Sequence, residues 1–135
     1  MDFHEFKVRV RYAETDQMGV VYHGNYAQYL EMGRVEWLRS LGLSYSYMEK
    51  NGIMLPVVSL TINYKKPARY DDLITVRTIF KKQQSVKIEF EYEIYNEAGE
   101  LLTTGSSVLV FVDMKTGRPV LPPEYVLEAL SKIKN

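Results

Sequence analysis

The sequence contains no cysteine among its 135 residues, which excludes disulfide scaffolds, thiolate metal sites and cysteine nucleophiles. It also lacks net charge, because 17 basic residues balance 17 acidic ones, and this argues against a nucleic-acid binder that relies on a general basic surface. No apolar run approaches the roughly 18 residues of a membrane span, and the N-terminus has no basic start followed by an apolar stretch. We therefore expect a cytoplasmic protein that does not cross a membrane.

Several enzyme motifs are absent as well. The chain has no Gly-x-Ser-x-Gly elbow, no Gly-x-Gly-x-x-Gly loop, no Walker A motif and no His-Glu-x-x-His helix. These absences argue against a metal enzyme or a nucleotide-cofactor enzyme. We expect an activity that needs no metal and no organic cofactor.

The composition fits one compact domain covering residues 1–135. Hydrophobic residues make up 46% of the chain and aromatic residues 13%, which is enough for a core of ordinary size. No repeat or low-complexity segment divides the chain, so a single domain is predicted.

The periodicity of apolar residues changes along the chain. Residues 6–12 alternate between apolar and basic side chains, which predicts a half-buried strand. Residues 25–41 carry apolar side chains at helical spacing, and Gly42 follows as a left-handed cap. A glycine inside that helix, Gly33, costs about 1 kcal/mol against alanine, which indicates close approach of another element. A short helical turn is expected at residues 44–50.

The rest of the chain reads as strands joined by short turns. The expected strands cover residues 58–65, 74–80, 86–94 and 101–113. The last one alternates less cleanly, and Gly105 inside it suggests a β-bulge. A short helix is expected after Pro122 and Pro123.

This order of elements predicts an α+β fold, in which a five-stranded antiparallel sheet wraps around one long helix. The sheet would keep open edges. Together with 11 tyrosines, the open edges suggest that part of the surface pairs with a second copy, although the aromatic residues could equally be internal packing.

Asp16 is the first candidate for chemistry, because it lies between the first strand and the start of the long helix. A helix start has unpaired N–H groups that can hold a developing oxyanion, while a nearby carboxylate directs a water or attacks directly. Acyl transfer needs both parts. The alternative is that Asp16 only shapes a turn, a common place for aspartate.

Two segments carry a resemblance to a known family. They are Tyr12-x-x-Thr15-Asp16-x-x-Gly19-Val-Val-Tyr22-His23-x-Asn25-Tyr26 and Tyr64-x-x-Pro67-Ala-Arg69-x-Asp71-Asp72. With the element order, they resemble the 4-hydroxybenzoyl-CoA thioesterase family of hotdog-fold acyl-CoA thioesterases, and especially the small bacterial enzymes associated with the Tol-Pal gene cluster. The resemblance covers residues 5–125.

The resemblance implies a hotdog domain that dimerises by extending its sheet, with dimers commonly paired into tetramers and active sites at the subunit interface. It places the family's catalytic aspartate, a general base or nucleophile, on Asp16. It places the backbone N–H oxyanion donor on His23. The imidazole of His23 has a second interpretation, as a polar residue that is simply compatible with a helix start.

Further site residues are expected around this pair. Tyr22, Gly24 and Tyr26 flank the helix start and would contact substrate, although the tyrosines could also be ordinary core. Glu31, further along the helix, corresponds to a carboxylate in relatives that take a hydroxylated aromatic acyl group, but a solvated helix face would explain it too.

Coenzyme A carries phosphates, so its site needs cations. Lys65, Lys66 and Arg69 cluster near one strand end, and Lys82 lies near another. Arg69 and Lys82 are the candidates suggested by the resemblance, and protection of sheet edges is the competing explanation.

We therefore expect an acyl-CoA thioesterase whose substrate, acyl-CoA, is hydrolysed to a free acid and coenzyme A. Two alternatives stay open: a hydratase or dehydratase on the same fold, and a module that binds acyl-CoA without hydrolysing it.

Overall fold

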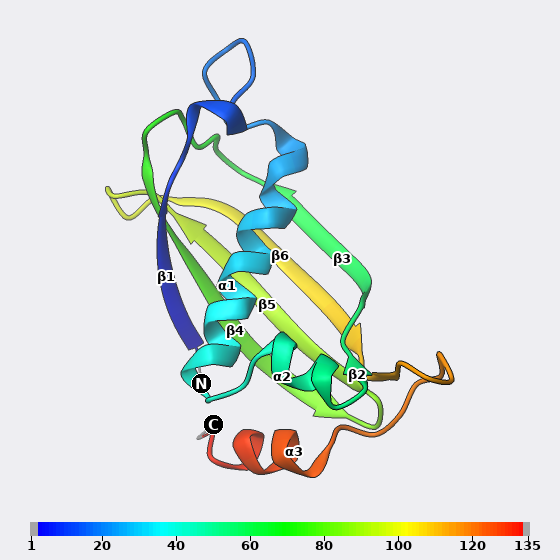
Figure 1. Cartoon of the computed structure of the whole chain (residues 1–135). Helices are drawn as coiled ribbons and strands as arrows, with labels where there is room; N and C mark the ends of the chain where they lie inside the picture. Colours follow the sequence, from blue (N-terminus) through cyan, green and yellow to red (C-terminus); the bar gives the residue numbers. More distant parts are fainter. Residues whose placement is uncertain (1–2, 134–135) are drawn as a thin grey trace.

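A computed structural model describes residues 3–133 and contains a five-stranded antiparallel sheet in the order β1-β4-β5-β6-β3. The strands are β1 (Phe3–Arg9), β3 (Val57–Tyr64), β4 (Leu73–Gln84), β5 (Lys87–Tyr95) and β6 (Leu101–Val110). Figure 1 shows the long helix α1 (Tyr26–Ser40) crossing one face of this sheet. The predicted α+β architecture, a sheet wrapped around one long helix, is confirmed.

Smaller elements surround this frame. Short 3-10 turns η1 (Tyr12–Glu14) and η2 (His23–Asn25) lie between β1 and α1. The helices α2 (Tyr45–Lys50) and α3 (Glu124–Ser131) lie at the opposite end of the molecule from the loop that joins η1 to η2 (Figure 1). A two-stranded sheet joins β2 (Ile53–Met54) to β7 (Val112–Asp113).

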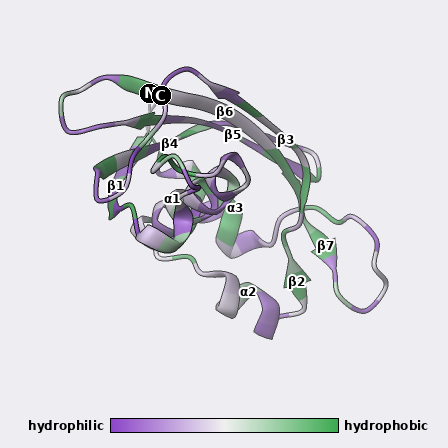
Figure 2. Ribbon diagram, turned by 90° about the horizontal axis from the view of Figure 1, so that it is seen from above, coloured by the Kyte–Doolittle hydropathy of each residue, from purple (hydrophilic) through white to green (hydrophobic). Residues whose placement is uncertain are grey.

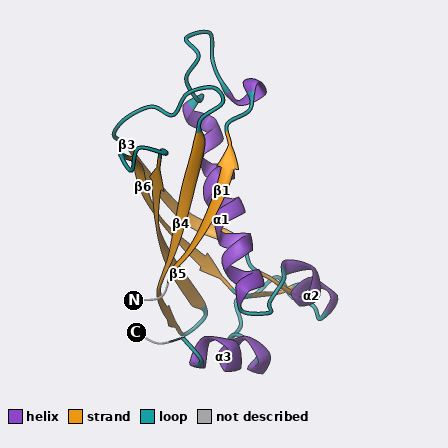
Figure 3. Cartoon of the chain, turned by 90° about the vertical axis from the view of Figure 1, so that its left-hand side faces the viewer, coloured by secondary structure: helices purple, strands orange, loops and turns teal. Residues whose placement is uncertain are grey.

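The sheet curves around α1 (Figure 2). The face of the helix that is buried carries mostly apolar side chains together with Arg34. In side view, α1 lies against a single face of the sheet (Figure 3). The fully buried side chains at the centre include Trp37, whose ring stacks on Phe80 at 5.6 Å and meets Phe90 edge-on at 5.0 Å. This core fixes the helix axis and therefore the position of the helix start.

The close approach predicted at Gly33 is confirmed. A Cβ atom built there would lie 2.7 Å from Thr78 Oγ1 and 2.7 Å from Val76 Cγ1, both on β4. The predicted cap at Gly42 is also confirmed, because its φ is +78°.

Three predictions about the strands need correction. Gly105 is not in a bulge: it pairs in register with Ile62 and Tyr92, and the absent side chain makes room for Thr61 O and Leu30 Cδ1. The strand predicted over residues 101–113 is broken after Val110, because the chain leaves the large sheet to pair with β2. The first strand ends at Arg9, and residue 12 lies in η1.

β3 is an edge strand with unusual exposure. One of its sides pairs with β6, and the other has no partner strand among residues 3–133. Val57, Val58 and Leu60 on it are all more than 40% exposed. An apolar edge of this kind is a surface that proteins normally cover, so it agrees with the predicted second copy, which stays a prediction.

No helix within residues 3–133 is long and apolar enough to cross a membrane. The cytoplasmic location and the single-domain extent of residues 1–135 stay predictions.

Candidate active site

Asp16 occupies a tight hairpin between η1 and η2. Its N–H donates to Val20 O at 2.8 Å, and Gly19 closes the turn with a φ of +77° that favours glycine. Asp16 Oδ1 accepts hydrogen bonds from Met18 N at 2.8 Å and from Val20 N at 3.4 Å. Asp16 Oδ2 has no hydrogen-bond partner in residues 3–133, so one carboxylate oxygen is fixed and the other is available.

The start of the helix supplies unpaired N–H groups. η2 leads directly into α1, and no described residue accepts a hydrogen bond from His23 N or Gly24 N. His23 O, by contrast, accepts from Tyr64 OH at 3.1 Å, which ties the turn to the end of β3. Free N–H groups at a helix start form a site for negative charge.

These two features share one cavity of about 290 Å³. Its lining comes from four segments of the chain: Asp16, Val20, Val21, His23, Tyr26, Tyr64, Lys65, Lys66 and Pro67. Of the predicted site residues, Asp16, His23 and Tyr26 are therefore brought together. The cavity combines apolar walls with a carboxylate and two lysines, as ligand sites commonly do.

Tyr26 forms a rigid wall of the cavity. It is 3% exposed, and its OH accepts a hydrogen bond from Ala68 N at 3.2 Å. Burial raises the pKa of this phenol, so it stays neutral at physiological pH. Its ring meets Tyr64 edge-on at 5.2 Å.

The basic side chains predicted to bind phosphate differ in their ion-pair partners and in their distance from the cavity. Lys66 Nζ forms an ion pair with Glu100 at 2.7 Å, whereas Lys65 has no ion-pair partner in the described part of the chain. Arg69 is exposed and its backbone bridges to Val20, so it lies beside the cavity without lining it. Lys82 is near the opposite end of β4, 3.7 Å from Glu89. Arg69 and Lys82 are thus not brought together within one chain.

The remaining predicted residues lie around the cavity or away from it. Tyr22 is 50% exposed, and its ring lies 4.4 Å from the His23 ring. Gly24 is covered by Tyr22, since a Cβ there would come within 2.6 Å of that ring. Glu31 is exposed and lines two other cavities together with Arg34, on the flank near β3. The roles assigned to these residues stay predictions.

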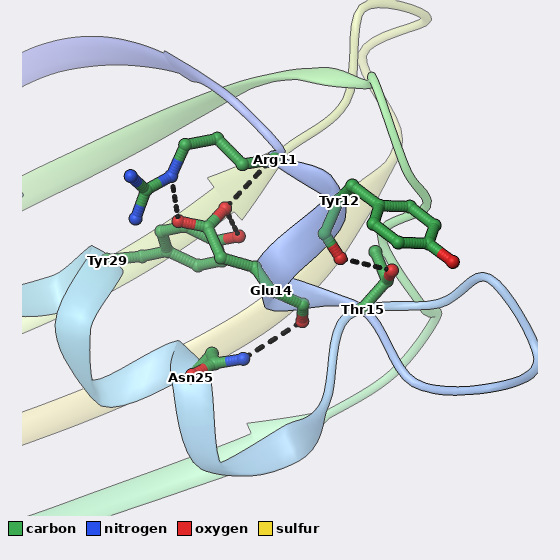
Figure 4. Close-up of polar contacts among 6 residues, drawn as sticks. All are labelled: Arg11, Tyr12, Glu14, Thr15, Asn25 and Tyr29. Atoms are coloured by element: carbon green, nitrogen blue, oxygen red, sulfur yellow. Dashed lines mark hydrogen bonds and ion pairs between the residues drawn. The ribbon is translucent and has the colours of Figure 1, made fainter.

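Glu14, to which no sequence pattern assigned a role, makes the polar contacts drawn in Figure 4. It is only 4% exposed. Burial alone would raise the pKa of its carboxyl, but hydrogen bonds from the Arg11 backbone, the Tyr29 hydroxyl and the Arg11 side chain lower it overall. Glu14 is therefore a buried carboxylate. A glutamate three residues after an arginine is the only local signal, and it is a weak one.

Metal binding has little support in residues 3–133, where no cluster of three or more histidine, aspartate or glutamate side chains could hold an ion. The expectation that no metal or organic cofactor is needed stays a prediction.

Comparison with known proteins identifies relatives along nearly the whole chain. Residues 10–130 match the model of the thioesterase-like superfamily. The putative acyl-CoA thioesterase YneP of Bacillus subtilis is 44% identical over 114 residues, which cover 84% of this chain and 83% of YneP. The acyl-CoA thioester hydrolase YbgC of Escherichia coli is 33% identical over 90% of this chain and 91% of its own.

A solved structure agrees with these matches. The DHNA-CoA thioesterase of Staphylococcus aureus superposes with a TM-score of 0.93 at 43% identity, over 98% of this chain and 91% of that one. The fold, the share of each chain that is covered and the sequence identity all indicate the same family. The chain belongs to the thioesterase-like superfamily of hotdog-fold enzymes and is a thioester hydrolase.

Proposed function

We propose that this enzyme is an acyl-CoA thioesterase that uses Asp16 to direct attack on the thioester carbonyl and the N–H groups at the helix start to hold the oxyanion. The observation that carries the proposal is the shared cavity, in which a carboxylate with one available oxygen lies alongside a helix start with unpaired N–H groups. The names of the relatives support acyl-CoA as the substrate.

In the proposed reaction, Asp16 removes a proton from water as the water attacks the carbonyl carbon. The two hydrogen bonds to Oδ1 hold the carboxylate while Oδ2 acts as the base. Negative charge that develops on the carbonyl oxygen is stabilised by His23 N–H, with Gly24 N–H as a second donor. The thiolate of coenzyme A then leaves as the carbonyl re-forms, giving the free acid.

Direct attack by Asp16 on the carbonyl is the alternative chemistry, and it forms a mixed anhydride that water then hydrolyses. Both routes need the same available oxygen. The two routes are distinguished by quenching the reaction within a single turnover and measuring the mass of the protein, because only the covalent route adds an acyl group to it.

The two lysines on the cavity wall suit the charges of coenzyme A. Lys65 is the free cation and Lys66 is held by Glu100, so we expect Lys65 to contact a phosphate first. Arg69 precedes β4 and Lys82 lies near the C-terminal end of that strand, so they would act on one ligand only across two subunits.

A second copy along the exposed edge of β3 would create such a junction, as the resemblance to hotdog dimers and tetramers implies. The apolar exposure of Val57, Val58 and Leu60 supports that assembly.

For the acyl group we propose a hydroxylated aromatic acid. A 43% identical relative is called a DHNA-CoA thioesterase. Glu31 lies outside the Asp16 cavity of its own chain, so its carboxylate would accept a hydrogen bond from a ring hydroxyl only in a site that two subunits share. Replacing Glu31 by glutamine should then raise KM for hydroxylated aromatic acyl-CoAs more than for straight-chain ones.

The decisive experiment measures thiol release from a panel of acyl-CoAs by the wild type and by Asp16→Asn. Because the chain has no cysteine, a thiol reagent meets no background from the protein. We expect turnover by the wild type and a loss of about 10²-fold or more in the variant, the range for a positioned general base. Equal rates would remove Asp16 from the mechanism. Tight binding of acyl-CoA without thiol release would favour the binding module, and hydration of an enoyl thioester would favour the hydratase.

A further inference from the structure

We propose that Glu14 is a positioning residue, whose buried carboxylate and backbone carbonyl hold the Asp16 hairpin and the helix start in one fixed geometry. The inference rests on the proposed function, since it concerns the two parts of that site. Nothing in the chemistry proposed for Asp16 requires a second carboxylate to touch the substrate, and Glu14 does not line the cavity.

The carboxylate joins the entry of the loop to the body of the long helix. Glu14 Oε1 accepts hydrogen bonds from Arg11 N at 2.9 Å and from Tyr29 OH at 2.7 Å, and Oε2 accepts from Arg11 Nε at 2.9 Å (Figure 4). Tyr29 is fully buried one turn into α1, so its hydroxyl is a rigid anchor. The chain two residues before Asp16 is thereby fastened to the helix.

The backbone of the same residue reaches the helix start. Glu14 O accepts a hydrogen bond from Asn25 Nδ2 at 2.9 Å (Figure 4). It accepts another from Tyr22 N, also at 2.9 Å. Tyr22 and Asn25 bracket His23 and Gly24, the residues whose N–H groups have no partner. One residue thus contacts both the segment that carries the base and the segment that carries the oxyanion donors.

The location of this network argues for positioning. Burying a carboxylate is costly unless it is fully hydrogen-bonded, and an apolar side chain would fill the same space at lower cost if cohesion alone were required. The hydrogen bond from Tyr29 OH to the carboxylate is charged and directional, so it fixes the entry of the loop against α1 where an apolar contact would leave the separation adjustable. A misplacement of about 1 Å between a catalytic group and its target costs about 10²-fold in rate.

The test measures kcat and KM for thiol release with Glu14→Ala and Tyr29→Phe, each in the wild-type and in the Asp16→Asn background. We expect Glu14→Ala to lower kcat about 10²-fold with KM nearly unchanged, and Tyr29→Phe to lower it less, since Arg11 N still holds Oε1. In the Asp16→Asn background both substitutions should lower kcat by a smaller factor, because the base is already gone and only the oxyanion donors remain to be positioned. Glu14→Gln, which keeps one acceptor oxygen, should restore part of kcat.

Ile88→Val provides the matched control. Ile88 is 1% exposed and pairs with Gln83 at the far end of β4, so the substitution weakens the core without touching the loop. Its kcat should equal that of the wild type at a temperature where both are folded.

The outcomes separate the inference from the function on which it rests. If Glu14→Ala lowers kcat equally in both backgrounds, or only in proportion to its loss of folded protein, the positioning role is refuted while Asp16 keeps its own. If the wild type releases no thiol, or Asp16→Asn is as active as the wild type, the proposed function fails and the inference fails with it.

Discussion

Replacing Gly33 by alanine should destabilise the enzyme even though alanine is the better helix former. Gly33 lies in the interior of α1, where alanine is favoured by about 1 kcal/mol. The opposing effect is steric, because the new Cβ would lie 2.7 Å from both Thr78 Oγ1 and Val76 Cγ1.

The steric effect should win. Thr78 and Val76 are each 0% exposed and belong to β4, which is paired on both sides by β1 and β5. Their branched side chains have few rotamers, so the strand or the helix must shift. Overpacking of this kind costs about 1–3 kcal/mol, and two hard contacts favour the upper half of that range. We expect a net loss of about 1–2 kcal/mol, or about 3–8 °C in Tm.

The assay is thermal and urea unfolding at one fixed protein concentration, because association between copies would shift the transition. Gln28→Ala on the exposed face of the same helix is the control and should change stability by less than about 0.5 kcal/mol. In a Val76→Ala background the cost of Gly33→Ala should shrink, since one of the two contacts is gone. A Gly33→Ala variant as stable as the wild type, or more stable, would refute the close approach of α1 to β4 at Gly33.

Further outcomes follow from other parts of the molecule. Because the pKa of Glu14 is lowered on folding, its contribution to stability is present above its ordinary pKa of 4.5 and is lost as the pH falls through the lowered value. The difference in stability between wild type and Glu14→Gln should therefore be full at pH 7 and should shrink as the pH of an acid unfolding series falls below 4.5. Arg34 is 6% exposed and donates to Tyr45 OH and Tyr92 OH from two different nitrogens, so Arg34→Lys should lose about 1–3 kcal/mol in urea unfolding. Lys65→Ala should raise KM for acyl-CoA about 5-fold at low salt with kcat unchanged, and a KM that stays constant would remove this lysine from the phosphate site. Leu60→Lys on the edge of β3 should shift the assembly toward monomers in light scattering; an unchanged mass would place any second copy elsewhere.

Local patterns in the sequence were sufficient to predict most elements and the position of Asp16 before a helix start. Helical spacing predicted both ends of α1 to within one residue, because the apolar residues of a helix recur with a period of 3.6 along the sequence itself. Gly42 was interpreted correctly because a positive φ at a helix end favours glycine. Gly33 was interpreted correctly because a glycine inside a helix indicates that another element comes close, and that element is β4. The placement of Asp16 before a helix start followed from sequence order.

Only the tertiary structure decided which distant segments share the site. Alternation along a strand tells which side chains share a face, but not which strand pairs with it in the sheet. The break after Val110 and the regular pairing of Gly105 were therefore missed. Lys65 reaches the cavity because β3 ends beside the helix start, while Lys82 is left at the far end of β4. The burial of Glu14 arises where Tyr29 and Arg11 converge on it, and no periodicity records that convergence, since hydrogen bonds between loops depend on three-dimensional distance alone.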